Sequence, residues 1–163
     1  MNEGPVVCDA GPLIALASVD QVGLLPSLYQ RIVVPEAVLV EVVQSGAGRA
    51  GASEIASAHW LEVVPSRGDL DPLLAAELGN GESAVIRVAV QLGAPLALLD
   101  ERRARRIAAQ VYGLAVKGTA GLLVTARRAG LIAKIRPLLE GMTRQGYYLS
   151  ARLIEAACQE VDE

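Results

Sequence analysis

The sequence of 163 residues contains no phenylalanine, one tryptophan and four tyrosines, so only 3% of its side chains are aromatic. Modules that bind single-stranded nucleic acid by base stacking commonly present aromatic rings as a platform, so this composition disfavours a base-stacking module. It has a single histidine, so a histidine-based metal site or catalytic triad is disfavoured. Two cysteines, Cys8 and Cys158, form no disulfide framework and no metal-binding spacing. We expect both to be small buried hydrophobic residues.

Long hydrophobic runs are also missing, although 52% of the residues are hydrophobic and the mean hydropathy is +0.37. Charged residues, glycine or proline interrupt every apolar run well before the roughly 18 residues that a membrane span needs. The apolar residues therefore predict a buried core and no membrane association. Residues 1–12 lack a basic leader and have an acid in their apolar run, so we expect a cytoplasmic protein.

The net charge of −3 argues against a protein that holds nucleic acid by bulk positive charge. Only two of the 15 basic residues are lysines. Several arginines gather in the segment ERRARR, Glu101 to Arg106. This grouping predicts a local basic rim on an otherwise acidic protein.

Short apolar runs typical of strands alternate with helical patterns along the chain. The strand-like runs are residues 5–8, 31–34, 61–64, 96–99 and 114–117. The clearest helical stretches are Pro35 to Gln44, Gly81 to Gln91, Glu101 to Tyr112 and Thr119 to Ala129. Repeated strand–helix units predict an α/β fold with a central parallel sheet and helices on both faces, a three-layer α/β/α sandwich. Because the strands are continuously apolar, we expect them to be buried on both faces.

We predict a single domain, residues 1–163, with a C-terminal helical extension from about residue 131. Residues 45–58 are rich in glycine, alanine and serine and are expected to form a loop or a weak helix. Tyr147 and Tyr148 are interpreted as packing or dimer contacts.

Two aspartates follow strand-like runs. Asp9 follows residues 5–8 and Asp100 follows residues 96–99. In open parallel sheets ligands bind beyond the carboxyl ends of the strands, so both carboxylates would face one crevice if these strands were neighbours. Aspartate is also a preferred helix N-cap, which explains either residue alone equally simply.

Two glutamates lie on predicted helices. Glu82 lies in the first turn of its helix, where the helix dipole favours an acid. Glu41 lies among valine and leucine residues in PEAVLVEVVQ, and a helix that is apolar nearly all round is expected to be buried on most faces. An isolated buried carboxylate costs several kcal/mol unless a cation or a donor meets it, so capping does not explain Glu41.

Four acids that converge in one crevice repel one another unless positive charge intervenes. The acids are Asp9, Glu41, Glu82 and Asp100. Oxygen ligands without histidine or cysteine suit Mg²⁺ or Mn²⁺, which completes its shell with water and substrate phosphate. The pattern predicts metal-assisted phosphodiester hydrolysis, with these four acids as catalytic and metal-binding residues. Arg102 and Arg103, which follow the last acid, are predicted to bind substrate phosphates.

Together these motifs resemble the PIN-domain family of metal-dependent ribonucleases, which includes the VapC-type toxins of bacterial and archaeal toxin–antitoxin pairs. The segments similar to the four acid-bearing segments of the family are VVCDAGPLIALA, VPEAVLVEVV, LGNGESAVIRVA and LALLDERRAR. The resemblance implies a Mg²⁺ (or Mn²⁺) site formed by the four acids. It also implies single-stranded RNA as the substrate, a homodimer and a small antitoxin protein as a partner. Thr119 matches a position where a hydroxyl supports the site or the bound substrate, although an N-cap explains it as well.

The chain also departs from the family pattern, because the third acid of the toxins is more often aspartate than glutamate. Its long helical tail is similar to a less characterised branch described as predicted nucleic-acid binding. Our main prediction is a metal-dependent endoribonuclease that cleaves single-stranded RNA, the toxin of a type II pair. Two alternatives remain open. One is a catalytically silent PIN-like module that binds RNA or a protein, and the other is a flavodoxin-like domain that binds a small ligand in the same crevice.

Overall fold

The computed structural model describes residues 3–45, 51–69 and 71–163. At its centre is a five-stranded parallel sheet with the order β3-β2-β1-β4-β5. The strands are β1 (Val6–Cys8), β2 (Ile32–Pro35), β3 (Leu61–Val64), β4 (Leu96–Leu98) and β5 (Val116–Lys117). Each strand lies within or beside one predicted run, so the predicted α/β class is confirmed.

The helices surround the sheet. They are α1 (Ala10–Ser18), α2 (Leu24–Leu28), α3 (Glu36–Ser45), α4 (Ala52–Ala56), α5 (Pro72–Glu77), α6 (Asn80–Leu92), α7 (Arg102–Gln110), α8 (Thr119–Arg128), α9 (Arg136–Arg144) and α10 (Ala151–Gln159). The four clearest helical predictions correspond to α3, α6, α7 and α8, with small differences at their ends. Helix α4 forms part of the segment expected to be a loop or weak helix, and residues 46–50 of that segment lie outside the described residues.

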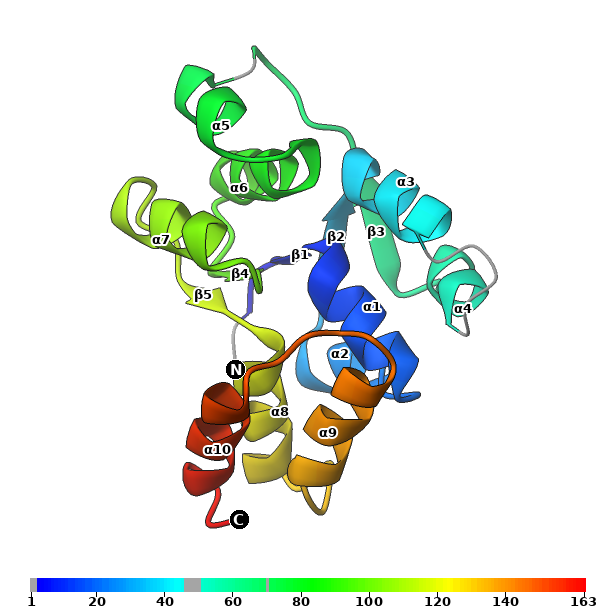
Figure 1. Cartoon of the computed structure of the whole chain (residues 1–163). Helices are drawn as coiled ribbons and strands as arrows, with labels where there is room; N and C mark the ends of the chain where they lie inside the picture. Colours follow the sequence, from blue (N-terminus) through cyan, green and yellow to red (C-terminus); the bar gives the residue numbers. More distant parts are fainter. Residues whose placement is uncertain (1–2, 46–50, 70) are drawn as a thin grey trace.

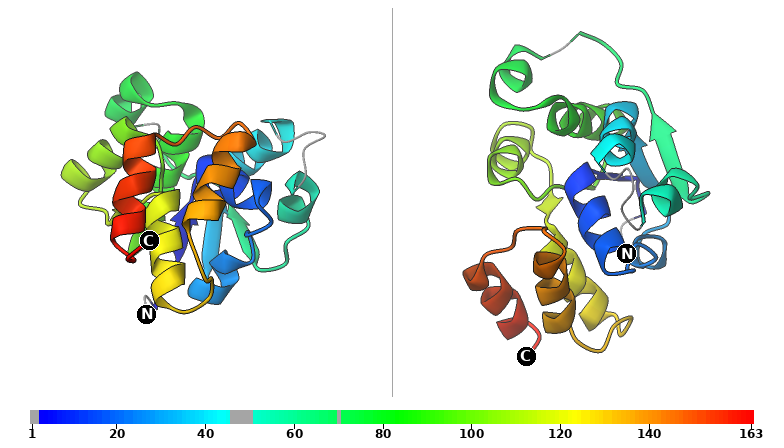
Figure 2. Two further views of the ribbon diagram at one scale, coloured as in Figure 1. Left: turned by 60° about the horizontal axis from the view of Figure 1, so that its bottom comes forward. Right: turned by 45° about the vertical axis from the view of Figure 1, so that its right-hand side comes forward.

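The helices form two layers around the sheet (Figure 1). Helices α5, α6 and α7 lie on one side, and α6 packs on β1, β2 and β4. Helices α1 and α2 lie on the other side, as the turned views also show (Figure 2). Helix α3 packs against both α1 and α6, while α8, α9 and α10 form a group beside α1. The arrangement is the predicted three-layer sandwich.

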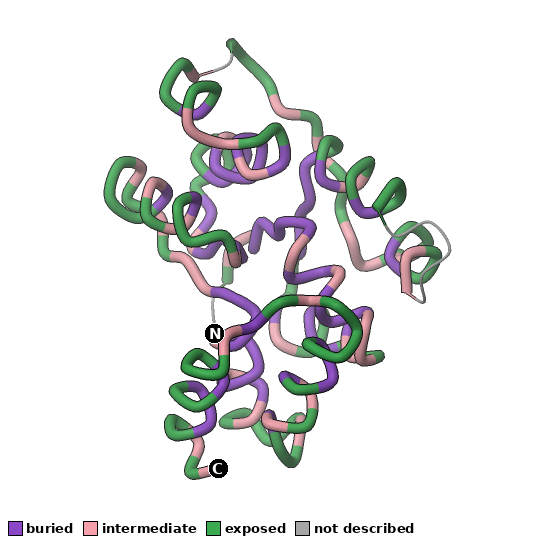
Figure 3. Tube along the Cα trace, viewed as in Figure 1, coloured by how far each residue is buried: buried purple, intermediate pink, exposed green. Residues whose placement is uncertain are grey.

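Burial follows this layering, with the buried residues gathered on the strands and on the inner faces of the helices (Figure 3). Strands β1, β2 and β4 are buried along their whole length. The expectation that all strands are buried on both faces is wrong for β3, where Glu62 and Val63 are exposed. The physical reason is that β3 is an edge strand, and the Glu62 carboxylate pairs with Arg31 at the surface.

The strand order also fixes where a ligand would bind. Strand β1 pairs with β2 on one side and with β4 on the other, so the order reverses between β1 and β4. In open parallel sheets the crevice lies beyond the carboxyl ends of the strands at this reversal. The order differs from the 2-1-3-4-5 order of flavodoxin-like sheets, so the flavodoxin-like alternative is wrong. No helix in the described ranges is both long and apolar enough to cross a membrane.

Candidate active site

The two aspartates lie where the sheet order reverses. Strands β1 and β4 are neighbours, as the crevice hypothesis required, with Cys8 opposite Leu98. The backbone N–H of Asp9 donates to the Leu98 carbonyl at 3.0 Å, which holds Asp9 over the end of β4. Asp100 lies two residues after the end of β4, at the same edge of the sheet.

Helix capping does not account for these aspartates. Asp9 occupies the N-cap position of α1, but its side chain makes no capping hydrogen bond. Helix α7 is capped by Glu101, whose carboxylate accepts from the amides of Arg103 and Ala104. Because Glu101 performs the capping, the Asp100 carboxylate is available for other contacts.

The Asp9 side chain is almost completely buried, with 8% of the residue exposed. Burial, opposed by the Ala10 amide and reinforced by the charges of Glu82, Glu41 and Asp100, raises the pKa of Asp9 from 3.8 to about 7. The other three acids are therefore close enough to raise the pKa of Asp9, and without a cation Asp9 is only partly ionised at neutral pH.

Glu41 reaches the crevice, although not for the reason that the sequence suggested. Helix α3 buries only Val38 and Val42, while Val40 and Val43 are 49% and 45% exposed. Glu41 itself belongs to the exposed residues, so the predicted burial of this helix on most faces is wrong. An outer-layer helix needs only one apolar side to pack against the protein, even when its sequence is apolar nearly all round.

The Glu41 carboxylate nevertheless lies next to Asp9. A Cβ atom at Gly81 would lie 2.5 Å from Glu41 Oε2 and 3.5 Å from Asp9 Oδ1. Although the residue as a whole is exposed, partial burial of the carboxylate raises the pKa of Glu41, and the charge of Glu82 adds to this effect. Two carboxylates from different elements thus meet at a glycine in the first turn of α6.

Glu82 caps the start of α6 and also faces the acidic crevice. Its Oε2 accepts a hydrogen bond of 3.0 Å from the Gly79 amide, so it does cap the start of α6. It also lines an open cavity of about 760 Å³ between α3 and α6, together with Glu36 and Glu41. Because its charge contributes to the raised pKa values of Asp9 and Glu41, Glu82 faces the acidic crevice while it caps the helix.

Asp100 is held by several donors. Its Oδ1 accepts from the Thr119 amide at 2.6 Å, and its Oδ2 accepts from the Thr119 hydroxyl at 2.5 Å. The Tyr147 hydroxyl also donates to Oδ2. The N-cap of α8 is Gly118, so the N-cap explanation of Thr119 is wrong. Thr119 is fully buried, which places it behind Asp100 and away from any surface that a substrate could reach.

The hydroxyl contact of Tyr147 was not predicted from the sequence. The ring packs against the core, as expected of a packing residue. Its partner lies 47 residues earlier in the chain, and no motif joins the two positions. The sequence therefore predicts the packing of the ring but not the hydrogen bond of the hydroxyl.

The arginines of α7 differ in their surroundings. Arg102 is exposed, and the Arg103 guanidinium pairs with Glu77 of α5. Arg105 Nη1 would lie 3.5 Å from a Cβ atom at Gly118, a position that is 2.8 Å from Asp100 Oδ1. The Arg105 guanidinium therefore lies beside the acidic crevice.

The donor set of the crevice fits a hard divalent cation. In the described ranges, none of the four acids forms an ion pair. Their carboxylates supply only oxygen ligands, the type that Mg²⁺ and Mn²⁺ prefer. Across those same residues, no three Asp, Glu, His or Cys side chains form a compact cluster that could hold a metal ion. The acids therefore form an open set, with Asp9 and Glu41 meeting at Gly81 and Asp100 at the end of the neighbouring strand.

Comparison with known proteins adds one finding. A family model described as a PIN domain matches residues 5–163, which include all four acids and the helices after residue 131. A comparison with curated proteins gives no match.

Proposed function

The chain belongs to the PIN-domain family, whose fold is of the nuclease type, and we propose that it is a metal-dependent endoribonuclease that cleaves single-stranded RNA. One observation carries the proposal. Asp9 lies buried at the sheet reversal, and its burial together with the charges of Glu82, Glu41 and Asp100 raises its pKa to about 7. Folding such charges together is unfavourable unless a bound cation compensates them.

We assign Asp9, Glu41, Glu82 and Asp100 as the residues that hold Mg²⁺ or Mn²⁺. When bound, the cation supplies an activated water and stabilises the negative charge that develops on the phosphate oxygens. Asp9 contributes a buried carboxylate that the strand β1 fixes in place. Glu41 is exposed to the cavity beside α6, so it is the acid best placed to orient an attacking water.

We assign the recognition of substrate phosphates to the arginines of α7, with Arg105 as the principal contact. Its guanidinium lies beside Asp100, whereas Arg103 is engaged by Glu77. Phosphate contacts suit a protein with so few aromatic rings, because they bind the RNA backbone without base stacking. Arg102 and Arg103 then guide the flanking phosphates, and Thr119 supports Asp100 from behind.

Cleavage of a mixed single-stranded RNA tests this function. We expect the purified protein to cleave it in Mg²⁺ or Mn²⁺ and to lose this activity in EDTA. Asp9→Asn should abolish cleavage, while Asp69→Asn, at an exposed position between β3 and α5, should not. Cleavage that survives EDTA or Asp9→Asn would contradict the proposal. If the protein binds RNA but never cuts it in either metal, the silent PIN-like module is the correct interpretation.

From the family resemblance we also propose a toxin role in a type II pair, a small antitoxin protein as the inhibitor, and a homodimer. From the sequence itself we propose a cytoplasmic location and one domain, residues 1–163, with a C-terminal helical extension from about residue 131. Light scattering of the purified chain tests the dimer. Rescue of growth by a short neighbouring reading frame during expression of the chain tests the toxin role.

A further inference from the structure

The C-terminal segment reaches the acidic crevice through the loop that joins α9 to α10. This loop passes over the group formed by α8, α9 and α10 (Figure 1). It carries Tyr147, whose hydroxyl donates to Asp100 Oδ2. A segment outside the four acid-bearing motifs thus contacts one of the four acids directly.

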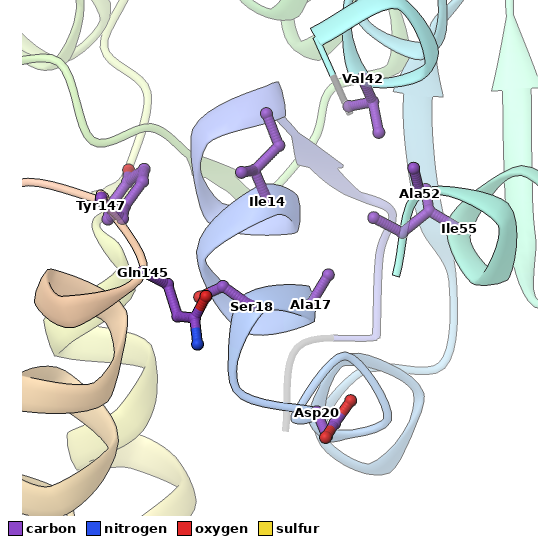
Figure 4. Close-up of a pocket in the computed structure, with 10 residues that line it drawn as sticks. Ile14, Ala17, Ser18, Asp20, Val42, Ala52, Ile55, Gln145 and Tyr147 are labelled. Atoms are coloured by element: carbon purple, nitrogen blue, oxygen red, sulfur yellow. The ribbon is translucent and has the colours of Figure 1, made fainter. Parts of the chain in front are cut away.

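The backbone of Tyr147 is held by a hydrogen bond and its ring packs against the core. Its backbone N–H donates to the Met142 carbonyl at 3.0 Å, and Gly146 before it adopts a φ of +94°, which favours glycine. Its ring lines a cavity of about 460 Å³ together with Ile14 of α1 (Figure 4). These contacts aim the hydroxyl at Asp100 before any ligand binds.

Gly11 leaves the space that the hydroxyl occupies. A Cβ atom at position 11 would lie 2.9 Å from the Tyr147 hydroxyl oxygen and 3.5 Å from Asp100 Oδ2. A side chain there would press on the tyrosine hydroxyl. The contact therefore depends on a residue at each end of the chain.

The donors around Asp100 are not shared equally between its two oxygens. A carboxylate has about four acceptor positions, two on each oxygen. The hydroxyls of Thr119 and Tyr147 use both positions on Oδ2, and the Thr119 amide uses one on Oδ1. With respect to the described residues, one acceptor position remains, on Oδ1. The two hydroxyls thus determine which oxygen of Asp100 is available to a cation.

We propose that Tyr147 is a positioning residue that orients Asp100 for the divalent cation, so that the C-terminal extension completes the metal site. This inference rests on the proposed function, because it assumes that Asp100 is a metal ligand. Hydrogen-bond partners of metal-binding carboxylates fix the ligand orientation, and their loss typically weakens metal affinity or activity by about 10–100-fold.

Tyr147→Phe in the full chain tests the proposal, with Tyr148→Phe as the matched control because Tyr148 is 83% exposed. Calorimetric titration with Mn²⁺ should show about tenfold weaker binding for Tyr147→Phe and unchanged binding for Tyr148→Phe. RNA cleavage by Tyr147→Phe should fall at low Mn²⁺ and recover at saturating Mn²⁺, with an unchanged KM for RNA. A purely structural role would not produce this recovery.

A second variant, Gly11→Ala, reaches the same contact from the other side and should also weaken Mn²⁺ binding. If Tyr147→Phe and Gly11→Ala both bind Mn²⁺ as tightly as the wild type, the positioning role is overturned. If, in that case, the wild type still binds Mn²⁺ and Asp9→Asn does not, only the role of Tyr147 is overturned and the proposed function stays intact. If the wild type itself binds no Mn²⁺, both proposals fail.

Discussion

Replacing Asp9 with asparagine should make the metal-free protein more stable at pH 8, although it destroys the proposed site. The Asp9 carboxylate has an ordinary pKa of 3.8, and burial together with the neighbouring acids raises it to about 7 in the folded protein. Each pKa unit corresponds to 1.36 kcal/mol, so ionised Asp9 lowers the free energy of unfolding by up to about 4 kcal/mol. Asparagine has nearly the same shape and carries no charge, so it removes this penalty.

The sign and the pH window follow from linkage. Because the pKa of Asp9 is higher in the folded state, the folded protein binds more protons than the unfolded chain between pH 3.8 and about 7. The stability of the wild type therefore decreases as the pH rises through this window. The advantage of Asp9→Asn should be absent below pH 3.8, grow between pH 3.8 and 7, and be complete above pH 7.

Urea unfolding in EDTA at pH 5 and pH 8 measures this difference, with Asp69→Asn as the control for loss of an exposed carboxylate. Addition of Mg²⁺ should make the wild type the more stable of the two proteins. A ligand that binds only the folded state stabilises the wild type, and it has no site in Asp9→Asn. The reasoning is refuted if Asp9→Asn is no more stable than the wild type at pH 8 in EDTA. It is also refuted if the difference is the same at both pH values.

Three further outcomes are expected. Gly81→Ala should keep the fold but weaken Mg²⁺ binding in calorimetry, because its Cβ would lie 2.5 Å from the flexible end of Glu41; unchanged affinity would contradict this. Arg105→Ala should weaken RNA binding and reduce the slope of log affinity against log salt concentration by about 1. Arg102→Ala should have a smaller effect on both quantities, and equal effects of the two variants would contradict the assignment of Arg105. Thr119→Val should lower the free energy of unfolding in urea by about 1–3 kcal/mol, because Asp100 loses a donor. Thr119→Ser keeps the hydroxyl and removes only a buried methyl group, so its loss should be smaller; equal losses would point to packing instead.

The sheet and the main helices could be predicted from sequence because their signals are local. Strand β3 was predicted at its observed bounds, Leu61–Val64, from a short apolar run. Helix α5 was missed, although Asp71 as the N-cap and Pro72 at the first helical position form a recognisable start signal. With six residues, the helix is too short for the spacing of its apolar residues to reveal a helical period.

The candidate site was only partly predictable, because its details depend on contacts between distant segments. Asp9 and Asp100 were brought together correctly because strand ends and sheet topology follow general rules. Glu41 was placed near them on an incorrect assumption of burial, because composition does not tell which side of a helix faces the solvent. Glycines beside the acids were an unused signal, since a side chain at Gly81 would crowd two carboxylates.

The contact between Tyr147 and Asp100 has a consequence for biosynthesis. All four acids leave the ribosome before Tyr147 does, since they precede it in the chain, and N-terminal parts of a protein generally fold first. A nascent chain therefore contains every carboxylate of the crevice while the hydroxyl that orients Asp100 is still missing. If the chain cleaves RNA as proposed, it would acquire its full affinity for metal only late in translation, when most of its own messenger RNA has already been read.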